Sequence, residues 1–455
     1  MFAKINFHDE FYQKLKLLVL PITMQQFMLA LVSATDAIML GAVSQTSLSA
    51  VSLAGQIQFV LNLFISGISA GSGIMAAQYW GKKDAASIEE VMPIALRTNL
   101  IFSGAFTVFA AVAPEVLMRI FTSDPALIES GAVYLRAVSL SYLLCGISQI
   151  YLILLKNTGY ATVSSRISCT AVVVNIICNA ILIYGLFGLP ALGIQGAAYA
   201  TVAARLVELV WSYLETKQSG RVQIIWKKMF HAADAVLTKD FWRYTMPVLG
   251  AALVWGIAYV SYSVIMGHMG SDAVAANSIT TIAKNMLSCL IRGVSGGAGV
   301  LIGNLLGAGE LDKAKVYGGR LTRMAIVVGM TTGGLLMLIS PLIVRFAPLS
   351  DTAAEYLQYM LIFCGCNIMA QSVNTTVLDG IFCAGGDSKF DMKGNLGAMW
   401  CFSVPFGFFA AFVLKWPVMV VYCIVNLDEI MKIPAVYLHY KKYIWVRNIT
   451  VQEDA

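Results

Sequence analysis

The chain has 455 residues, of which 58% are hydrophobic and 12% are charged, and its formal net charge is +6. A soluble domain carries about 25% charged residues, so this composition leaves too little polar surface to cover a water-soluble globule. The composition excludes a cytosolic enzyme, a secreted disulfide scaffold, a nucleic-acid-binding protein and a disordered chain, and it predicts a membrane protein.

Long apolar segments follow one another along the chain. About 20 apolar residues and a short loop make one membrane-spanning helix, so a chain of this length holds roughly twelve. The segments lack the alternation of a membrane barrel. The twelve predicted spans are 17–40, 50–78, 91–113, 132–155, 163–187, 192–214, 243–267, 274–301, 316–341, 355–383, 394–414 and 417–438. The predicted fold class is an all-α polytopic membrane protein.

The loops between these spans differ in basic residues. If the N-terminus is cytoplasmic, 22 Lys and Arg residues lie in cytoplasmic loops and at most four in outer loops. Cytoplasmic loops of membrane proteins carry the excess of Lys and Arg. We therefore expect a multi-pass protein of the cell (inner or plasma) membrane with both termini in the cytoplasm.

The two halves of the sequence repeat at a shift of 226 residues. Pro21 aligns with Pro247, and the run GISAGSG (67–73) aligns with GVSGGAG (293–299). Each half holds six spans, so we expect two lobes related by pseudo-twofold symmetry along the membrane normal, with a substrate path between them. The glycine runs lie late in apolar spans, where close helix packing explains them better than phosphate binding does.

The expected division of the chain follows from this repeat. A basic, polar stretch separates the last span of the first half from the first span of the second. The predicted parts are an N-terminal lobe (1–215), a cytoplasmic linker (216–240) and a C-terminal lobe (241–455).

The cysteines and histidines give no sign of metal binding. The nine cysteines lie mostly in apolar runs, and the spacing of Cys364 and Cys366 is poor for a metal, so all nine are interpreted as small core residues. No histidine has a ligand partner at metal spacing, and no ATP-binding or hydrolase motif occurs. We expect no metal, no cofactor and no enzymatic activity.

Asp36 is the most informative charge, because it lies deep in the first span with no basic residue on that helix. A charge in the hydrocarbon costs about 2.5–3.5 kcal/mol on insertion scales, which makes it a functional candidate. A buried carboxylate can bind a proton, or Na⁺ with the help of neutral oxygens. The alternative is an Asp bonded to neighbouring hydroxyls that never titrates. Gln25 lies near the same helix face.

Three neutral side chains offer oxygens to a cation. Asn175 and Asn179 are four residues apart on one face of the fifth span, and Thr201 lies in the sixth. Amide and hydroxyl oxygens suit a hard cation. Each of these side chains is equally suited to a hydrogen bond between helices, so both interpretations stay open.

Two oppositely charged pairs have helical spacing. Arg205 and Glu208 are three residues apart in the sixth span, as are Glu429 and Lys432 in the twelfth. Residues at this spacing face each other on a helix. We interpret both pairs as structural ion pairs near the cytoplasmic ends, and Asp428 is placed to join the second.

The C-terminal half has further charges within its spans. Lys284 and Arg292 lie in the eighth span, and Asp379 in the tenth is placed to pair with either. A structural ion pair and a substrate-facing charge are both open. Two cations against one carboxylate leave positive charge that suits an anionic or zwitterionic group.

Several of these segments resemble the MATE (multidrug and toxic compound extrusion) family, within a superfamily that includes polysaccharide flippases. The resemblance covers about residues 15–445. It rests on Pro21, on Asp36 with the run DAIMLGAVSQTSLSAVSLAGQI, on QYWGKKD and NLLGAGELDKAK at two loop starts, on NIICNAILIYGLFGLPALGIQGAAYAT, and on GIFCAGGDSKF. It implies twelve spans in two six-helix lobes and exchange of Na⁺ or H⁺ for organic substrates by alternating access.

The resemblance also implies roles for single residues. Asp36 matches the carboxylate at the centre of the N-lobe cation site, and Asn175 and Thr201 match its partners. Asn179 departs from the family, because many members have Asp there. Pro21 matches a proline that is linked in some members to bending of the first span.

The C-terminal half departs further from the family pattern. Acidic residues found in the C-lobe cavity of some subgroups are missing, and the repeat position of Asp36 is Tyr262. Trp255 and Tyr259 supply aromatic surface nearby. The substrate-cavity candidates are Gln25, Trp255, Tyr259, Tyr262, Lys284, Arg292 and Asp379.

The leading hypothesis is a secondary antiporter that exports small organic compounds, as in multidrug efflux, in exchange for H⁺ or Na⁺. The alternative is a flippase for a lipid-linked precursor from the same superfamily. A receptor or scaffold without transport is a third possibility, and the six-span repeat argues against it. The expected partners are a small organic substrate and membrane lipid, without nucleic acid, and we expect a monomer.

Overall fold

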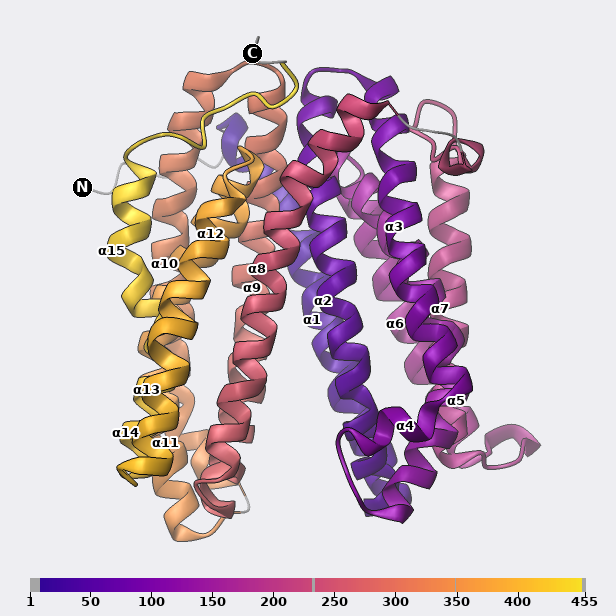
Figure 1. The fold of residues 1–455 in the computed structure, drawn as a ribbon, viewed down its shortest axis with the longest axis vertical. Helices are drawn as coiled ribbons and strands as arrows, with labels where there is room; N and C mark the ends of the chain where they lie inside the picture. The colour runs from indigo at the N-terminus through magenta and orange to yellow at the C-terminus, as the bar shows by residue number, and fades with distance from the viewer. Residues whose placement is uncertain (1–8, 231–233, 348, 452–455) are drawn as a thin grey trace. The chain divides into compact units, whose positions relative to one another are not determined.

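A computed structural model describes residues 9–230, 234–347 and 349–451 (Figure 1). Every regular element in these ranges is a helix, which confirms the all-α prediction. Ten of the described helices are long and apolar enough to cross a membrane. The packing divides the chain into two units, Met1–Gln26 with Gly81–Lys83 and Gly250–Ala455, and Phe27–Trp80 with Asp84–Leu249.

The unit that contains Phe27–Trp80 and Asp84–Leu249 holds the later part of the first helix and the six helices after it. Its hydrophobic core includes Leu61, Leu135 and Tyr142. Its elements are α1 (Glu10–Val43) from Phe27 onward, α2 (Gln45–Gly81), α3 (Ala85–Val112), α4 (Pro114–Arg119), α5 (Pro125–Asn157), α6 (Ala161–Tyr184), η1 (Leu186–Gly188), α7 (Gly193–Thr216), η2 (Trp226–Phe230) and the start of α8 (Ala235–Gly267).

The other unit holds the first turns of α1 and the elements that follow Gly250. One of its hydrophobic cores contains Phe11, Leu321 and Phe382. Its further elements are α9 (Ser271–Gly307), α10 (Leu311–Phe346), α11 (Asp351–Thr375), η3 (Thr376–Phe382), α12 (Ser388–Asn395), η4 (Leu396–Ser403), α13 (Val404–Phe408), η5 (Phe409–Val413), α14 (Val418–Val425) and α15 (Asp428–Tyr440).

Most of the long helices exceed the apolar segments that predicted them. The 37 residues of α9 extend for about 55 Å at 1.5 Å per residue, whereas the hydrocarbon core is about 30 Å thick. Polar capping residues set the ends. Asp84 accepts a hydrogen bond from the backbone N–H of Ser87 at the start of α3, and Asp124 caps α5 ahead of Pro125. Such caps satisfy backbone donors that the first turn leaves unpaired.

Two of the twelve predicted spans are not among the ten apolar helices of the described chain. α7 forms as predicted, but it carries Arg205, Glu208 and Glu215 along its length. The twelfth segment is interrupted at Asn426 and Leu427, between α14 and α15. Three π-helical segments, η3, η4 and η5, also interrupt regular helix near the C-terminal end.

The two glycine runs provide sites of close helix packing, as predicted. Gly67 and Gly71 of α2 lie against the first half of α8, where a Cβ at Gly71 would stand 2.6 Å from the Cα of Thr245. Their repeat mates Gly293 and Gly297 of α9 lie against the first half of α1, where a Cβ at Gly297 would stand 2.9 Å from the Val19 side chain. In each case the missing side chain lets two helices touch.

This packing divides the chain differently from the expected 1–215, 216–240 and 241–455. Phe11 and Leu15 of α1 pack in one core with Leu301 and Leu305 of α9, so the start of the chain belongs with the C-terminal helices. The predicted linker lies within the unit that ends at Leu249. That 1–215 and 241–455 act as the two lobes that move during transport stays a prediction.

All nine cysteines are free thiols. Cys145, Cys289, Cys364 and Cys383 are buried, as the interpretation as core residues requires. Cys366 and Cys401 are exposed, so for these two that interpretation is wrong. An apolar run in a membrane protein predicts equally well a side chain that faces lipid, which explains the error.

Candidate functional site

Asp36 lies where α1, α6 and α7 bring polar side chains together. Its Oδ1 accepts a hydrogen bond of 2.6 Å from the amide nitrogen of Asn179. The same nitrogen donates to the side-chain oxygen of Asn175, at 3.1 Å. Asn175 in turn donates to the hydroxyl of Thr201 at 3.4 Å, which donates to the carbonyl of Ala197. The structure thus brings together the four side chains that the sequence singled out.

The surroundings of Asp36 are almost free of charge. Its recorded hydrogen-bond donor is an amide, and no ion pair involves it among the described residues. Asn179 is fully buried, and its side-chain oxygen has no hydrogen-bond partner. A buried acceptor without a donor costs about 1–3 kcal/mol. The site therefore has a spare oxygen atom beside a carboxylate, which is the chemistry of a site for a cation or a proton.

Glu208 on α7 is a buried carboxylate of the same unit, and its contacts are complete. It accepts from Arg205 at 2.7 Å and from the hydroxyls of Ser148 at 3.0 Å and Ser168 at 3.3 Å. The side chain is 2% exposed. These contacts join α5, α6 and α7, and they fit the structural role expected of the Arg205–Glu208 pair.

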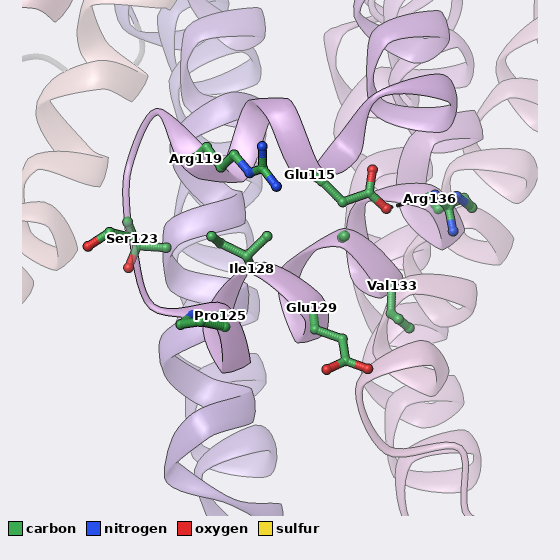
Figure 2. A pocket seen from close by; sticks show the side chains of 10 residues that line it. Glu115, Arg119, Ser123, Pro125, Ile128, Glu129, Val133 and Arg136 are labelled. Atoms are coloured by element: carbon green, nitrogen blue, oxygen red, sulfur yellow. Dashed lines mark hydrogen bonds and ion pairs between the residues drawn. The ribbon is translucent and has the colours of Figure 1, made fainter.

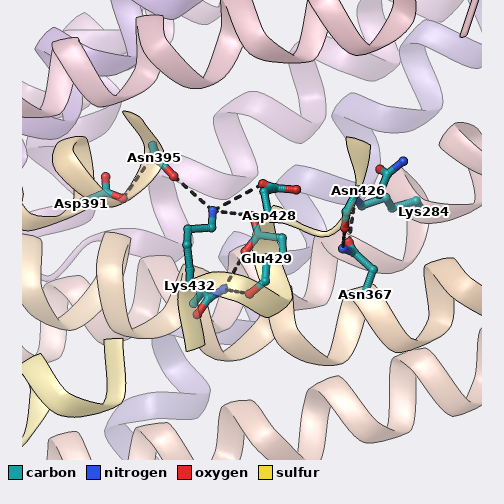
Figure 3. Close-up of polar contacts among 9 residues, drawn as sticks. Lys284, Asn367, Asp391, Asn395, Asn426, Asp428, Glu429 and Lys432 are labelled. Atoms are coloured by element: carbon teal, nitrogen blue, oxygen red, sulfur yellow. Dashed lines mark hydrogen bonds and ion pairs between the residues drawn. The ribbon is translucent and has the colours of Figure 1, made fainter. Parts of the chain in front are cut away.

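The second predicted ion pair lies in a larger polar cluster of the other unit (Figure 3). Lys432 lies 2.9 Å from Glu429 and 3.7 Å from Asp428. It also donates to the side-chain oxygen of Asn395, which donates to Asp391. Asp428 therefore does join the pair. The cluster ties α15 to α12, and Asn374 of α11 extends it through a 2.8 Å bond to Glu429.

The charges predicted near a substrate do not pair with each other. Lys284 donates to the amide oxygen of Asn367 at 3.2 Å, as Figure 3 shows. Arg292 is exposed, and so is Asp379 on the π-helical turn η3. Among the described residues, neither cation forms an ion pair with Asp379. Both interpretations of these charges, a structural pair and a substrate-facing charge, therefore stay predictions.

The remaining candidates lie in the same unit as these charges. Trp255 and Tyr259 stack on one face of α8, with ring centroids 5.5 Å apart. Tyr262 packs at the edge of a small core that contains Ile265 and Val421. Gln25 lies on α1, eleven residues before Asp36 and in the other packing unit from it. The structure therefore groups the aromatic residues, and Gln25 belongs to the same packing unit as they do.

A surface pocket that the sequence did not predict lies on α4 and α5 (Figure 2). Its volume is about 680 Å³. Glu115 and Arg136 form an ion pair of 3.0 Å at its rim, and both side chains are about half exposed. Exposed pairs of this kind contribute about 0–1 kcal/mol. Arg119 and Glu129 also line the pocket, so its charges are mixed and select no particular ligand.

Comparison with known proteins identifies the family of the chain. The family model MatE matches residues 21–181 and 247–409, once in each half of the sequence. The chain belongs to the MATE family. The two matched ranges begin 226 residues apart, the same offset as the internal repeat. The protein is therefore a membrane transporter, of a family that acts on small organic substrates. Its relatives support multidrug efflux as the kind of function.

The related sequences are distant but cover most of the chain. An uncharacterized transporter of Bacillus subtilis (strain 168), YisQ, is 23% identical over 91% of this chain and 90% of its own length. A probable multidrug resistance protein of Agrobacterium fabrum, NorM, is 24% identical over 76% of this chain and 73% of its own. A NorM of Bacillus cereus is 23% identical over 89% and 90%.

Solved structures share the fold. A MOP superfamily transporter from Pyrococcus furiosus matches with a TM-score of 0.85 and 17% identity over 95% of both chains. A MATE solved in the straight conformation matches with a TM-score of 0.85 over 95% of this chain and 96% of its own. One in the bent conformation matches with 0.82 over 96% of both. The predicted membrane fold is confirmed by these matches.

The sequence did not predict several polar contacts within each unit. Ser148 and Ser168 bond Glu208 from helices that are 60 and 40 residues away in the chain. Asn374 and Asp391 belong to the Lys432 cluster. The four-residue spacing of Asp391 and Asn395 was a usable signal, because side chains at this spacing meet on a helix. The serines gave no such signal.

Proposed function

We propose that the protein is a secondary antiporter, in which binding of H⁺ or Na⁺ at Asp36 drives export of a small organic compound by alternating access. The observation that carries the proposal is that Asp36 is held by the amide of Asn179, with no cation paired to it in the described chain. A carboxylate without a fixed counter-ion is free to take one up and release it.

The chemistry of the site supports an exchangeable cation. In the amide orientation recorded here, Asn179 turns its nitrogen toward Asp36 and leaves its oxygen without a donor. A flip of this amide would aim the oxygen at Asp36. That orientation suits either a protonated Asp36, which becomes a donor, or Na⁺ held between two oxygens. Cation binding would thus replace one hydrogen-bond arrangement by another, and so favour one state of α1.

α1 is the element through which such a change would act. Asp36 and Pro21 lie on the same continuous helix, Glu10–Val43, and the two residues fall in different packing units. A proline inside a helix removes one backbone hydrogen bond and permits a bend. We therefore assign Pro21 a conformational role, in which a bend of α1 accompanies cation exchange at Asp36.

The C-terminal half suits a substrate with negative charge. Lys284 bonds to a neutral amide, Arg292 is exposed, and the stacked rings of Trp255 and Tyr259 offer an apolar surface. Flat organic molecules that carry an anionic or zwitterionic group fit this combination. A precursor with a pyrophosphate headgroup fits the cations too, so the flippase remains the second candidate.

Transport in proteoliposomes tests the coupling. The purified chain is reconstituted, and uptake of ethidium, a planar cation, and of a zwitterionic fluoroquinolone is followed under a pH gradient or a Na⁺ gradient, applied separately. We expect one of the two gradients to drive uptake of at least one probe. The Asp36→Asn variant should insert normally and lose gradient-driven uptake, because an amide can neither bind a proton nor balance the charge of Na⁺.

The matched control is Asp312→Asn, the same chemical change at a side chain that is 98% exposed. Its uptake should equal that of the unchanged protein. Gradient-driven uptake that survives Asp36→Asn would overturn the proposed coupling site. Uptake of neither probe, together with gradient-independent movement of a lipid-linked pyrophosphate between leaflets, would favour the flippase.

A further inference from the structure

A groove lies at the end of α7, between this helix and the segment that follows it. Its volume is about 710 Å³. One wall is the last two turns of α7, with Val210, Tyr213 and Lys217, and the other is formed by Ile225, Trp226 and Lys227. All of these residues belong to one packing unit.

The segment that forms the second wall is firmly attached to three helices. The indole N–H of Trp226 donates to the hydroxyl of Tyr151 on α5 at 2.7 Å. Lys228 forms an ion pair of 2.6 Å with Glu90 on α3, and Arg221 pairs with Glu215 on α7. Trp226 is thereby fixed with its ring in the groove wall. The groove is a built feature of this unit.

Basic side chains line the groove. Lys228 and Arg221, which form the ion pairs just described, stand outside it. Lys217 and Lys227 line it, and the described residues of its wall include no Asp or Glu. Lys217 also lies over the ring of Tyr213, 5.5 Å from its centroid. The polar end of the groove therefore suits an anion.

The apolar end of the groove continues along the surface of α7. Leu206, Val210, Tyr213 and Leu214 recur at spacings of three and four residues, so they share one helix face. They are 50%, 48%, 36% and 57% exposed. In a membrane helix such a face contacts acyl chains. An aromatic pair and basic side chains directly beyond it mark the interface with the lipid headgroups.

We propose that this groove is a binding site for an anionic phospholipid. The phosphate headgroup lies between Lys217 and Lys227, the glycerol backbone lies against Tyr213 and Trp226, and an acyl chain follows the exposed face of α7. This site is independent of the proposed coupling at Asp36. It would give the transporter a preference for membranes that contain acidic lipid.

Lipid titration followed by native mass spectrometry tests the site. The delipidated full chain in detergent is titrated with phosphatidylglycerol or phosphatidylcholine that carry identical acyl chains. We expect the first phosphatidylglycerol to bind more tightly. The double variant Lys217→Gln/Lys227→Gln should weaken phosphatidylglycerol about thirty-fold, since each Lys near a membrane surface contributes about 1 kcal/mol, and should leave phosphatidylcholine unchanged.

The matched control is Lys441→Gln/Lys442→Gln. It removes the same charge at two exposed positions, one of which also lies over a tyrosine ring, and its lipid affinities should not change. Equal weakening in both double variants, or no weakening in the first, would overturn the site.

Two further measurements separate lipid from other occupants. Leu214→Asn should weaken both lipids alike, because it interrupts the surface for the acyl chain. Glycerol 1-phosphate should not displace phosphatidylglycerol at equal concentration. Displacement at equal concentration would show that the groove recognises a soluble phosphate, and would overturn the assignment to a lipid.

Discussion

Asp36 and Glu208 are two carboxylates of one packing unit with opposite surroundings. Glu208 accepts from a guanidinium and two hydroxyls, and its side chain is 2% exposed. Asp36 accepts from one amide, beside a second buried oxygen that has no donor. A buried carboxylate with a complete set of donors stabilises the helices around it. A carboxylate with an incomplete set is available for binding.

The same contrast separates Asp36 from the Lys432 cluster of the other unit. There a single ammonium lies within 4 Å of two carboxylates and bonds to Asn395 as well. Counter-ions built into the protein make a carboxylate part of the scaffold, whereas Asp36 has no such counter-ion among the described residues. Four substitutions test how far this distinction holds.

The largest effect on stability is expected for Glu208→Gln. It leaves the Arg205 guanidinium without its counter-ion among buried helices, which costs about 3 kcal/mol, at the low end for a broken buried pair because Arg205 is partly exposed. Thermal unfolding in detergent measures the loss. The double variant Glu208→Gln/Arg205→Met should recover most of it. An unchanged unfolding temperature for the single variant would show that the pair is not structural.

The next effect concerns transport and is expected for Asn179→Ala. This change removes the 2.6 Å hydrogen bond to Asp36 and the buried oxygen beside it. Hydrogen bonds to charged groups contribute about 1.5–3 kcal/mol, so gradient-driven uptake at a low ion concentration should fall at least about tenfold. Asn179→Asp keeps an oxygen at this position and should retain ion-dependent uptake. Unaltered uptake by the alanine variant would remove Asn179 from the site.

A smaller effect on stability is expected for Asp36→Asn. It replaces a carboxylate that has one amide donor, so the free energy of unfolding should change by no more than about 1 kcal/mol. The shift in unfolding temperature should be correspondingly small. This measurement runs beside the Glu208→Gln experiment, under the same conditions. Equal destabilisation by the two changes would erase the distinction between a structural and a binding carboxylate.

The smallest effect is expected at Asp9, before α1. The backbone N–H of Phe11 and the Arg320 guanidinium, 2.6 Å away, lower the pKa of Asp9 below its usual range. A lowered folded-state pKa stabilises the protein above the unfolded pKa, about 3.9, and this contribution is lost as the pH falls through the folded value. The Asp9→Asn variant should therefore unfold at a slightly lower temperature than the unchanged protein near pH 6. The difference should shrink as the pH falls below the unfolded pKa of about 3.9, and a constant difference would contradict this explanation.

The sequence predicts those features that arise within one helix or from the length of an apolar segment. Both ion pairs between residues three positions apart form, since helical geometry alone brings their side chains together. The alignment of Asn175 with Asn179 has the same origin. The close packing at Gly71 and Gly297 was expected because small residues in an apolar span have few other uses.

Contacts between distant helices could not be read in this way. The hydroxyls that complete Glu208 come from α5 and α6, and a serine in an apolar helix more often bonds its own backbone. The break between α14 and α15 also escaped prediction, because Asp428 and Glu429, which directly follow it, are assigned to an ion pair within one continuous span. The pocket of Figure 2 depends on the short helix α4, which lies outside every predicted span.

The glycine contacts of α2 and α9 have a consequence for how this protein can be recombined. Each run packs against the first part of the first helix of the opposite half, so the start of α1 packs with the C-terminal helices and the start of α8 with the N-terminal ones. A chimaera joined to a relative within residues 216–240 would therefore seat both helices on foreign surfaces. A chimaera that takes α1 and the second half from one protein, and the rest of the first half with α8 from the other, would keep both native contacts. The repeat is thus a duplication whose products are no longer separate modules.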